Sequence, residues 1–176
     1  MHARKLLIAT VLTLALPATA TAGDDKTAEV HAVSADGIGE KIGTVTFSES
    51  AEGLVIVPDL SQLSPGAHGF HIHQKPSCAP ATKDGKQVPA GAAGGHYDPA
   101  SKGKHDGPHG MGHRGDLPVL MVSDDGTANE KMVAPRLKLA DVEGRAIMIH
   151  EGGDNYSDSP KPLGGGGGRI ACGVID

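Results

Sequence analysis

The chain has 176 residues, a formal net charge of −5 at pH 7, two cysteines, two Phe, two Tyr and no Trp. The negative charge and the lack of a basic patch argue against nucleic acid and anionic membranes as partners, and the length suits one domain with its own core. With so few aromatic residues, that core must consist mainly of Val, Ile and Leu.

Residues 1–22 have the pattern of a secretory signal peptide. A basic start is followed by a short apolar run over residues 6–16, and small residues favour cleavage after Ala20 or Ala22. A membrane anchor is the alternative, but a run of eleven residues is too short to span a bilayer. We therefore predict export followed by cleavage, with no membrane attachment afterwards.

Cleavage would leave a domain of residues 23–176. Because Arg4 and Lys5 are the only charged residues of the leader, their removal changes the net charge from −5 to −7. In an oxidising compartment Cys78 and Cys172 are expected to form one intramolecular disulfide. A metal-ligating or catalytic thiol is disfavoured, because neither cysteine lies in a CxxC motif.

Short stretches of alternating apolar and polar residues recur through the remaining chain, separated by turn residues such as Asp and Gly. No stretch has strong helical periodicity. About eight short strands with regular turns predict an all-β domain, an antiparallel sandwich or barrel. The predicted strands are Ala28–Val33, Gly43–Phe47, Leu54–Asp59, Gly69–His73, Val119–Val122, Met132–Val133, Arg145–His150 and Arg169–Ile175.

Two segments depart from this pattern. Residues 74–117 contain nine Gly, five Pro and four His, and residues 151–168 end in a run of five glycines. Long loops without secondary structure inside a compact domain are usually functional or disordered. The glycine run alone favours disorder, but metal ligands and a disulfide would hold the longer loop against the barrel.

Three histidines in predicted strands are candidate metal ligands. In the segment Gly-Phe-His-Ile-His, His71 and His73 are two residues apart, so that their side chains share one face of a strand. His150 follows an alternating Ile-Met-Ile segment and takes the opposite face from Ile147 and Ile149. Taken alone, the pair His71 and His73 is as consistent with incidental surface residues as with a metal site, and for His150 alone the polar end of a strand is favoured.

The long loop supplies four more candidates: His96, His105, His113 and Asp116. Glycines flank them and let the backbone fold back closely, so that ligands eight or nine residues apart can converge. Three imidazoles and a carboxylate suit tetrahedral zinc, and four imidazoles suit copper. A four-nitrogen copper site and a four-ligand zinc site need eight ligands, and the seven residues provide eight only if one imidazole binds both metals.

These motifs resemble those of the copper/zinc superoxide dismutases, in particular the exported bacterial branch. The matching stretches are GFHIH, GGHYDP, GKH, GHRGDLP, IMIHEGGDNYSD and PLGGGGGRIACGVI. They extend over about residues 27–176, and no metal position departs from the family pattern. The resemblance implies an eight-stranded antiparallel Greek-key barrel with two long functional loops.

The resemblance also implies a role for each candidate residue. Arg169 would be the arginine beside the copper, and Asp154 would link a copper-binding histidine to a zinc-binding one. Cys78 and Cys172 would form the family disulfide. One copper and one zinc ion per subunit would be joined through His96, which would also take part in proton transfer. Copper would bind His71, His73, His96 and His150, and zinc would bind His96, His105, His113 and Asp116.

The activity implied is dismutation of superoxide, a small anion, to dioxygen and hydrogen peroxide in the periplasm, where it would protect the cell envelope from oxidative damage. An exported copper- and zinc-binding protein that buffers metal without turnover is the alternative. It is disfavoured because metal storage needs neither Arg169 nor a glycine-rich approach for an anion. A mononuclear zinc hydrolase is weaker still, because no dedicated general base is apparent. A homodimer and a monomer are both compatible with the resemblance.

Several polar residues near these motifs are given no role. For Asp98, which precedes a proline, we expect a side-chain turn rather than a zinc ligand. The other residues left without a role are His31, His68, Lys75, His109 and Tyr156.

Overall fold

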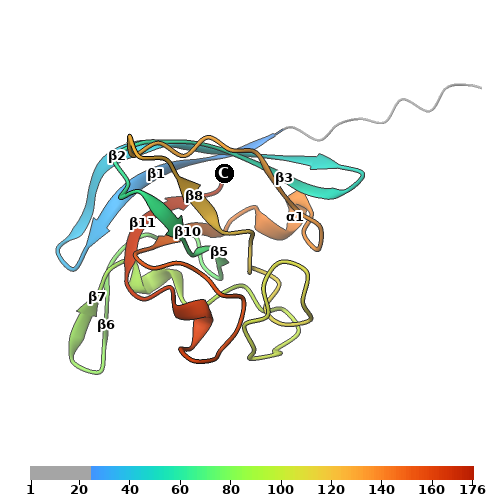
Figure 1. The fold of residues 1–176 in the computed structure, drawn as a ribbon. Helices are drawn as coiled ribbons and strands as arrows, with labels where there is room; N and C mark the ends of the chain where they lie inside the picture. The colour runs from blue at the N-terminus through green and yellow to red at the C-terminus, as the bar shows by residue number, and fades with distance from the viewer. Residues whose placement is uncertain (1–24) are drawn as a thin grey trace, which may run out of the picture.

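The computed structural model describes residues 25–176 (Figure 1). The predicted signal peptide, residues 1–22, lies outside the described residues. Within this range no helix is long and apolar enough to cross a membrane. The helical elements are the 3₁₀ turns η1 (Gly91–Ala93) and η2 (Leu163–Gly165) and the short helix α1 (Leu139–Val142). The strands are β1 (Lys26–Ser34), β2 (Gly37–Ser50), β3 (Gly53–Leu60), β4 (Gly66–His68), β5 (Phe70–His73), β6 (Ala81–Lys83), β7 (Lys86–Val88), β8 (Leu120–Val122), β9 (Met132–Ala134), β10 (Ala146–His150) and β11 (Arg169–Val174).

Seven strands form one curled antiparallel sheet in the order β5-β10-β11-β1-β2-β3-β9, and β4 pairs separately with β8. Two pairs of neighbours, β5 with β10 and β11 with β1, join strands that are far apart in the sequence. Such connections between distant strands are those of a Greek-key barrel. The predicted all-β Greek-key fold is confirmed, and each of the eight predicted segments overlaps a strand.

The aliphatic core predicted from the composition is also present. Strand β3 shows how alternation in the sequence produces this core: Leu54, Ile56 and Leu60 are buried and alternate with more exposed residues. Strand β10 is buried along its whole length. Its Ile147 and Ile149 belong to the main core, whereas Met148 packs in a second cluster with the two cysteines. The outer face of β10 is therefore covered as well, and that face is where the loops return.

Both long loops lie on the side of the molecule opposite β1, β2 and β3 (Figure 1). The first, between β5 and β8, contains the β6–β7 hairpin and η1, and the second, between β10 and β11, contains η2. The expected disulfide between Cys78 and Cys172 is present, with a Cα–Cα distance of 5.7 Å. It fastens the first loop to β11 across 94 positions of sequence.

Candidate metal centre

Three of the candidate ligands lie on neighbouring strands. In β5, His71 and His73 alternate with Phe70 and Ile72, which are buried in the main core. Both imidazoles therefore point to the opposite face of the sheet. His150 ends β10, the strand that pairs with β5. The paired strands thus bring three imidazoles to one face; the sequence pattern predicted the face of each histidine within its strand but not the pairing of the two strands.

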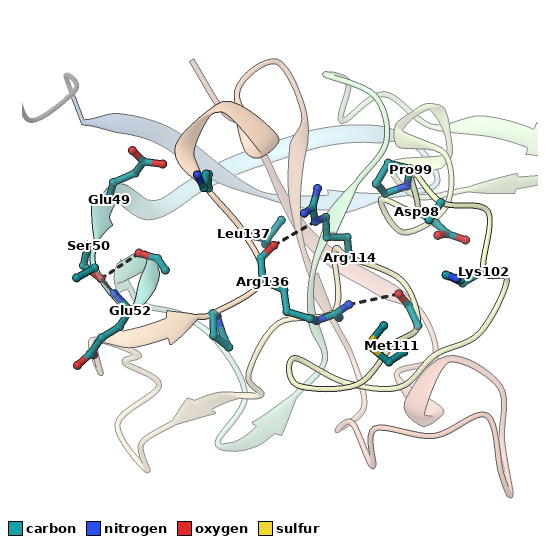
Figure 2. Close-up of a pocket in the computed structure, with 16 residues that line it drawn as sticks. Glu49, Ser50, Glu52, Asp98, Pro99, Lys102, Met111, Arg114, Arg136 and Leu137 are labelled. Carbon is teal, nitrogen blue, oxygen red and sulfur yellow. Dashed lines mark hydrogen bonds between the residues drawn. The ribbon is translucent and has the colours of Figure 1, made fainter.

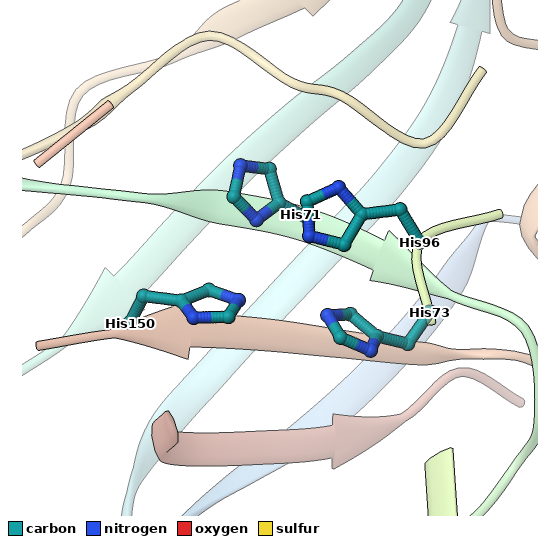
Figure 3. Close-up of side chains that lie close together, drawn as sticks. All are labelled: His71, His73, His96 and His150. Carbon is teal, nitrogen blue, oxygen red and sulfur yellow. The ribbon is translucent and has the colours of Figure 1, made fainter. Parts of the chain in front are cut away.

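His96 joins these three from the long loop, where it forms a backbone bridge with His73. One ring nitrogen from each of His71, His73, His96 and His150 lies within 4.8 Å of the others, and the four rings surround a common space (Figure 3). No member is more than 5% exposed. We call these residues the four-histidine group.

A second set, the mixed group, consists of His96, His105, His113 and Asp116, whose ligand atoms also lie within 4.8 Å of one another. The Asp116 carboxylate is central. Its Oδ1 is 2.9 Å from His96 Nδ1 and 3.5 Å from His113 Nδ1, and its Oδ2 is 3.0 Å from His105 Nδ1. The structure therefore gathers three nitrogens and a carboxylate at one point beside the four-histidine group.

Within the described residues, His96 is the one residue that belongs to both groups. Its Nδ1 contacts Asp116, and its Nε2 is buried without a hydrogen-bond partner. Its ring centroid is 4.1 Å from that of His71. One imidazole thus directs one nitrogen into each group.

The buried nitrogens without partners test whether these groups fit metal ions. Buried polar atoms are almost always hydrogen-bonded, since leaving one unpaired costs about 1–3 kcal/mol. Here one nitrogen of every histidine in the two groups lacks a partner; His105 Nδ1 is close to Asp116 but without hydrogen-bond geometry. Cations bound at these atoms would remove the cost, and the donor sets suit copper and zinc. The atoms are Nδ1 of His71, His105 and His113, and Nε2 of His73, His96 and His150.

The opposite nitrogens of several rings are held by hydrogen bonds, which fixes the nitrogen that each ring presents. His73 donates from Nδ1 to the Gly94 carbonyl at 2.9 Å, and His150 donates from Nδ1 to the Gly167 carbonyl at 3.3 Å. Each ring then offers Nε2 to the centre. Hydrogen bonds of this kind orient metal ligands and raise their basicity.

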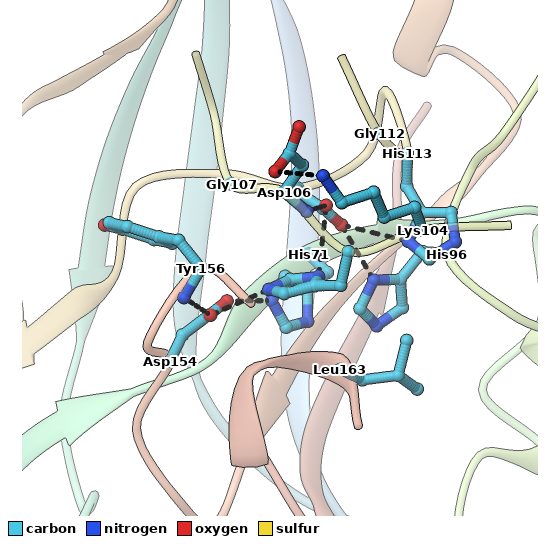
Figure 4. A network of polar contacts seen from close by, with 12 residues as sticks. His71, His96, Lys104, Asp106, Gly107, Gly112, His113, Asp154, Tyr156 and Leu163 are labelled. Carbon is cyan, nitrogen blue, oxygen red and sulfur yellow. Dashed lines mark hydrogen bonds and ion pairs between the residues drawn. The ribbon is translucent and has the colours of Figure 1, made fainter. Parts of the chain in front are cut away.

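Asp154 connects the two groups from the second loop (Figure 4). Its Oδ2 accepts from His71 Nε2 and its Oδ1 from His105 Nε2, both at 2.7 Å. Oδ1 also accepts from the backbone N–H of Tyr156 at 2.7 Å. A side chain at Gly164 would collide with this carboxylate, so the glycine run lets the loop close over it. Asp154 therefore contacts a histidine of each group, and the linking role that the family resemblance implies for it stays a prediction.

The four-histidine group is built to stay uncharged. Burial, together with the neighbouring His96 and His150, lowers the pKa of His71 to about 3, although the contact with Asp154 opposes the shift. Burial also lowers the pKa of His150 to about 4 and the pKa of His73 well below its usual value. The pKa of His96 is lowered for the same reason. At neutral pH these rings have lone pairs free for a metal.

The mixed group behaves differently. Burial lowers the pKa of His105, but contacts with Asp116 and Asp154 outweigh it and raise the pKa to about 9. Burial raises the pKa values of the Asp116 and Asp154 carboxyl groups, but their contacts with histidines lower these values by more, so both groups stay ionised. A cation that enters this group must therefore displace a proton from His105.

Arg169 begins β11 opposite His150. It donates from Nη1 to the Ala90 carbonyl and from Nη2 to the Gly94 carbonyl, both at 2.6 Å. Gly94 thus accepts from Arg169 and from His73. Within residues 25–176 Arg169 makes no ion pair with a carboxylate, so its charge remains available to an anion.

The structure gives His68 a contact that the sequence analysis missed. His68 is 2% exposed, and its Nδ1 is 2.7 Å from the carbonyl oxygen of His150. Its place three residues before His71 was the one signal in the sequence. Asp98 makes the expected turn by accepting from the Gly103 N–H at 2.8 Å, and it belongs to neither group.

Comparisons with known proteins agree with this geometry. A family model described as copper/zinc superoxide dismutase matches residues 41–175. "Superoxide dismutase [Cu-Zn] 2" of Salmonella typhimurium is 57% identical over 172 residues, which cover 97% of this chain and 99% of the relative.

Two solved structures are also similar. The copper/zinc superoxide dismutase from Brucella abortus is 53% identical with a TM-score of 0.85, and the monomeric enzyme from Salmonella enterica is 56% identical with a TM-score of 0.78. Each match covers 87% of this chain and 100% of the other. The chain belongs to the copper/zinc superoxide dismutase family. The relatives named here that match it over most of its length are bacterial.

Proposed function

We propose that this chain dismutates superoxide at a copper centre joined to zinc through the imidazole of His96. The observation that carries the proposal is the position of that ring, with Nε2 in the four-histidine group and Nδ1 in the mixed group. The chain is an oxidoreductase, and its cofactors are copper and zinc. The assigned copper ligands are His71, His73, His96 and His150, and the assigned zinc ligands are His96, His105, His113 and Asp116.

In the reaction, one superoxide loses an electron and leaves as dioxygen, and a second gains an electron and two protons and leaves as hydrogen peroxide. Bound copper supplies the one-electron redox chemistry, and bound zinc supplies a fixed positive charge. The residues of the chain provide the anion's approach, the orientation of the ligands and a path for protons.

We assign proton transfer to His96 Nε2. Burial lowers the pKa of this imidazole, and its contact with Asp116 opposes the shift. With zinc bound at Nδ1, the ring would be held in place and its Nε2–H would be a better proton donor. Asp154 keeps the neighbouring His71 and His105 rings fixed through each cycle.

We assign anion attraction to Arg169. A guanidinium is permanently charged, and a charge without a carboxylate partner can draw a small anion toward the centre despite the net charge of the chain. The alternative, a metal-buffering protein without turnover, gives no reason for such a cation. Superoxide consumption by protein loaded with one copper and one zinc distinguishes the two functions. Tight binding of both metals without turnover would support buffering.

Export and location are part of the proposal. Residues 1–22 are a cleaved signal peptide, residues 23–176 are the mature enzyme, and it works in the periplasm, where it protects the cell envelope. The bacterial relatives and the disulfide support this, since disulfides persist in oxidising compartments. Mass spectrometry of the protein from a periplasmic extract tests it, and a mature N-terminus near residue 21 or 23 is expected.

The oligomeric state is a separate question. A homodimer stays a prediction, and the Salmonella enterica relative is described as monomeric. Sedimentation velocity of the mature, metal-loaded protein distinguishes the two states.

A further inference from the structure

Arg136 lies between β9 and α1, outside both long loops. Its guanidinium nevertheless forms hydrogen bonds to the part of the first long loop that carries His113 of the mixed group. Its Nε donates to the Pro108 carbonyl at 2.9 Å and its Nη1 to the Gly112 carbonyl at 3.4 Å. Its Nη2 donates to the carbonyls of Gly107 at 2.9 Å and His113 at 2.7 Å. One guanidinium thus bonds four carbonyl groups within residues 107–113.

The segment has few other hydrogen bonds that fix its shape: the N–H of Met111 donates to Asp106 Oδ2 at 2.9 Å, that of Gly110 to the Gly107 carbonyl at 3.4 Å, and that of His113 to the Lys104 carbonyl. It contains Gly107, Gly110 and Gly112, and glycine-rich backbone loses more conformational freedom on ordering than any other. Figure 2 shows the Arg136 side chain extended to the loop beside Met111, at the wall of an open cavity of about 870 Å³. Met111 is 76% exposed, so the loop tip is not held by apolar burial.

The geometry suits arginine specifically. A guanidinium has five N–H donors in a rigid fork, whereas a lysine ammonium is a single point with three. Within residues 25–176 Arg136 makes no ion pair, so its donors are committed to these carbonyls. The Arg136 backbone is fixed in turn, because its carbonyl accepts from Arg114 Nε at 3.1 Å.

The hydrogen bond to His113 connects Arg136 to the mixed group. The His113 carbonyl accepts from Arg136, and its N–H donates to the Lys104 carbonyl at 2.8 Å. The backbone of His113 is therefore held on both sides, and its ring carries the unpaired Nδ1 that faces Asp116.

We propose that Arg136 is a positioning residue of the zinc shell: it orders residues 107–113, fixes His113 and so slows the release of zinc. The inference depends on the proposed zinc ligands. It predicts that loss of the guanidinium affects zinc and leaves the copper ligands, none of which lies in residues 107–113, largely unchanged.

The test uses Arg136→Met, which keeps the length of the side chain and removes its donors. Zinc release from the copper- and zinc-loaded mature protein to excess chelator should be about 10- to 100-fold faster than in the wild type, the range usual for outer partners of metal ligands. Copper content should stay within twofold. The absorption spectrum of cobalt placed at the zinc position should change, which a loss of overall stability alone would not cause.

Lys102→Met is the matched control. Lys102 lines the same cavity and is exposed, and its side chain makes no hydrogen bond or ion pair within residues 25–176. Zinc release from this variant should remain within twofold of the wild type. Arg136→Lys keeps the charge, and its release rate should lie between those of the wild type and Arg136→Met. It also serves as the test if the methionine variant does not fold.

Two outcomes would overturn different claims. A wild-type protein that holds no zinc would contradict the zinc assignment itself. A wild type that holds one zinc, with folded Arg136 variants that release it at the wild-type rate, would contradict only the role of Arg136. Equal acceleration in Lys102→Met, or equal loss of copper, would also contradict that role.

Discussion

Each imidazole of the centre depends on the group at its second nitrogen, and Asp154 is that group for one histidine of each set. Two carboxylate oxygens accept from two rings at 2.7 Å, so one side chain fixes the tautomer of His71 and the orientation of His105. An amide at this position could accept from only one of the two rings and would present a donor to the other.

We therefore expect Asp154→Asn to weaken zinc binding by about 10- to 100-fold while the barrel stays folded. Metal content after equilibration in zinc buffers measures the effect. Asp125→Asn is a suitable control, because Asp125 is exposed and contacts only its own turn at Thr127. Equal zinc affinity in Asp154→Asn and the control would show that Asp154 does not orient the zinc ligands.

Arg169 is a second single residue to test, and its replacement should change turnover through the loss of its positive charge. Arg169→Ile should slow superoxide turnover several-fold and flatten its dependence on ionic strength, because exposed charges steer anions most strongly when salt screening is weak. Arg169→Lys keeps a cation and should retain most of that dependence. Stopped-flow rates across a series of salt concentrations check both variants. Unchanged rates in the isoleucine variant would rule out the steering role.

At the scale of elements, the two ligand groups respond to pH in opposite directions. In the unfolded chain a histidine titrates near 6.5. The pKa values of His71 and His150 in the folded protein are about 3 and 4, so below pH 6.5 the unfolded chain binds protons that the folded chain does not, and folding weakens. The pKa of His105 is raised to about 9, so its contribution is fully present below pH 6.5 and is lost as the pH rises to 9.

The metal-free protein should therefore be most stable near neutral pH. Lowering the pH from 6.5 to 5 should cost roughly 2 kcal/mol for His71 and roughly the same for His150, and the lowered pKa values of His73 and His96 add to this loss. Raising it toward 9 should also destabilise the fold, through His105. Urea unfolding of metal-free protein at pH 5, 6.5 and 9 measures this. A stability that rises steadily over the whole range would contradict the assigned pKa shifts.

The elements also show what the sequence could predict. Strands such as β3 were recognisable because burial on one face imposes alternation, and His71 and His73 followed from the same rule. The β6–β7 hairpin was missed because its flanking residues are polar and barely alternate. Asp84-Gly85, a pair suited to a tight hairpin turn with positive φ, was its one local signal. The His68 contact depends on tertiary packing between distant segments, which no local pattern encodes.

The convergence of the loop ligands was a prediction of a different kind. Spacing and glycine content permitted His96, His105 and His113 to meet, but they did not require it. The positions of the ligands also depend on Asp154 and Arg136, whose partners among the ligands lie 23 to 83 residues away in the sequence. The family resemblance identified Asp154, and only the structure reveals Arg136.

At the scale of the whole molecule, the disulfide joins the barrel to its longest loop. Cys78 lies in the loop that supplies the Ala90 and Gly94 carbonyls, and Cys172 follows Arg169 by three residues in β11. The bond therefore limits how far those carbonyls can move from the guanidinium that they hold.

Replacing both cysteines with serine should lower the free energy of unfolding by about 4–5 kcal/mol, the chain-entropy value for a loop of this length. Urea unfolding of the metal-loaded protein measures this loss. Because Arg169 would also lose its rigid acceptors, turnover in the folded double variant should depend less on ionic strength than in the wild type. A variant that loses stability but keeps the wild-type salt dependence would limit the disulfide to holding the fold, since the hydrogen bonds to Ala90 and Gly94 would then suffice to place Arg169.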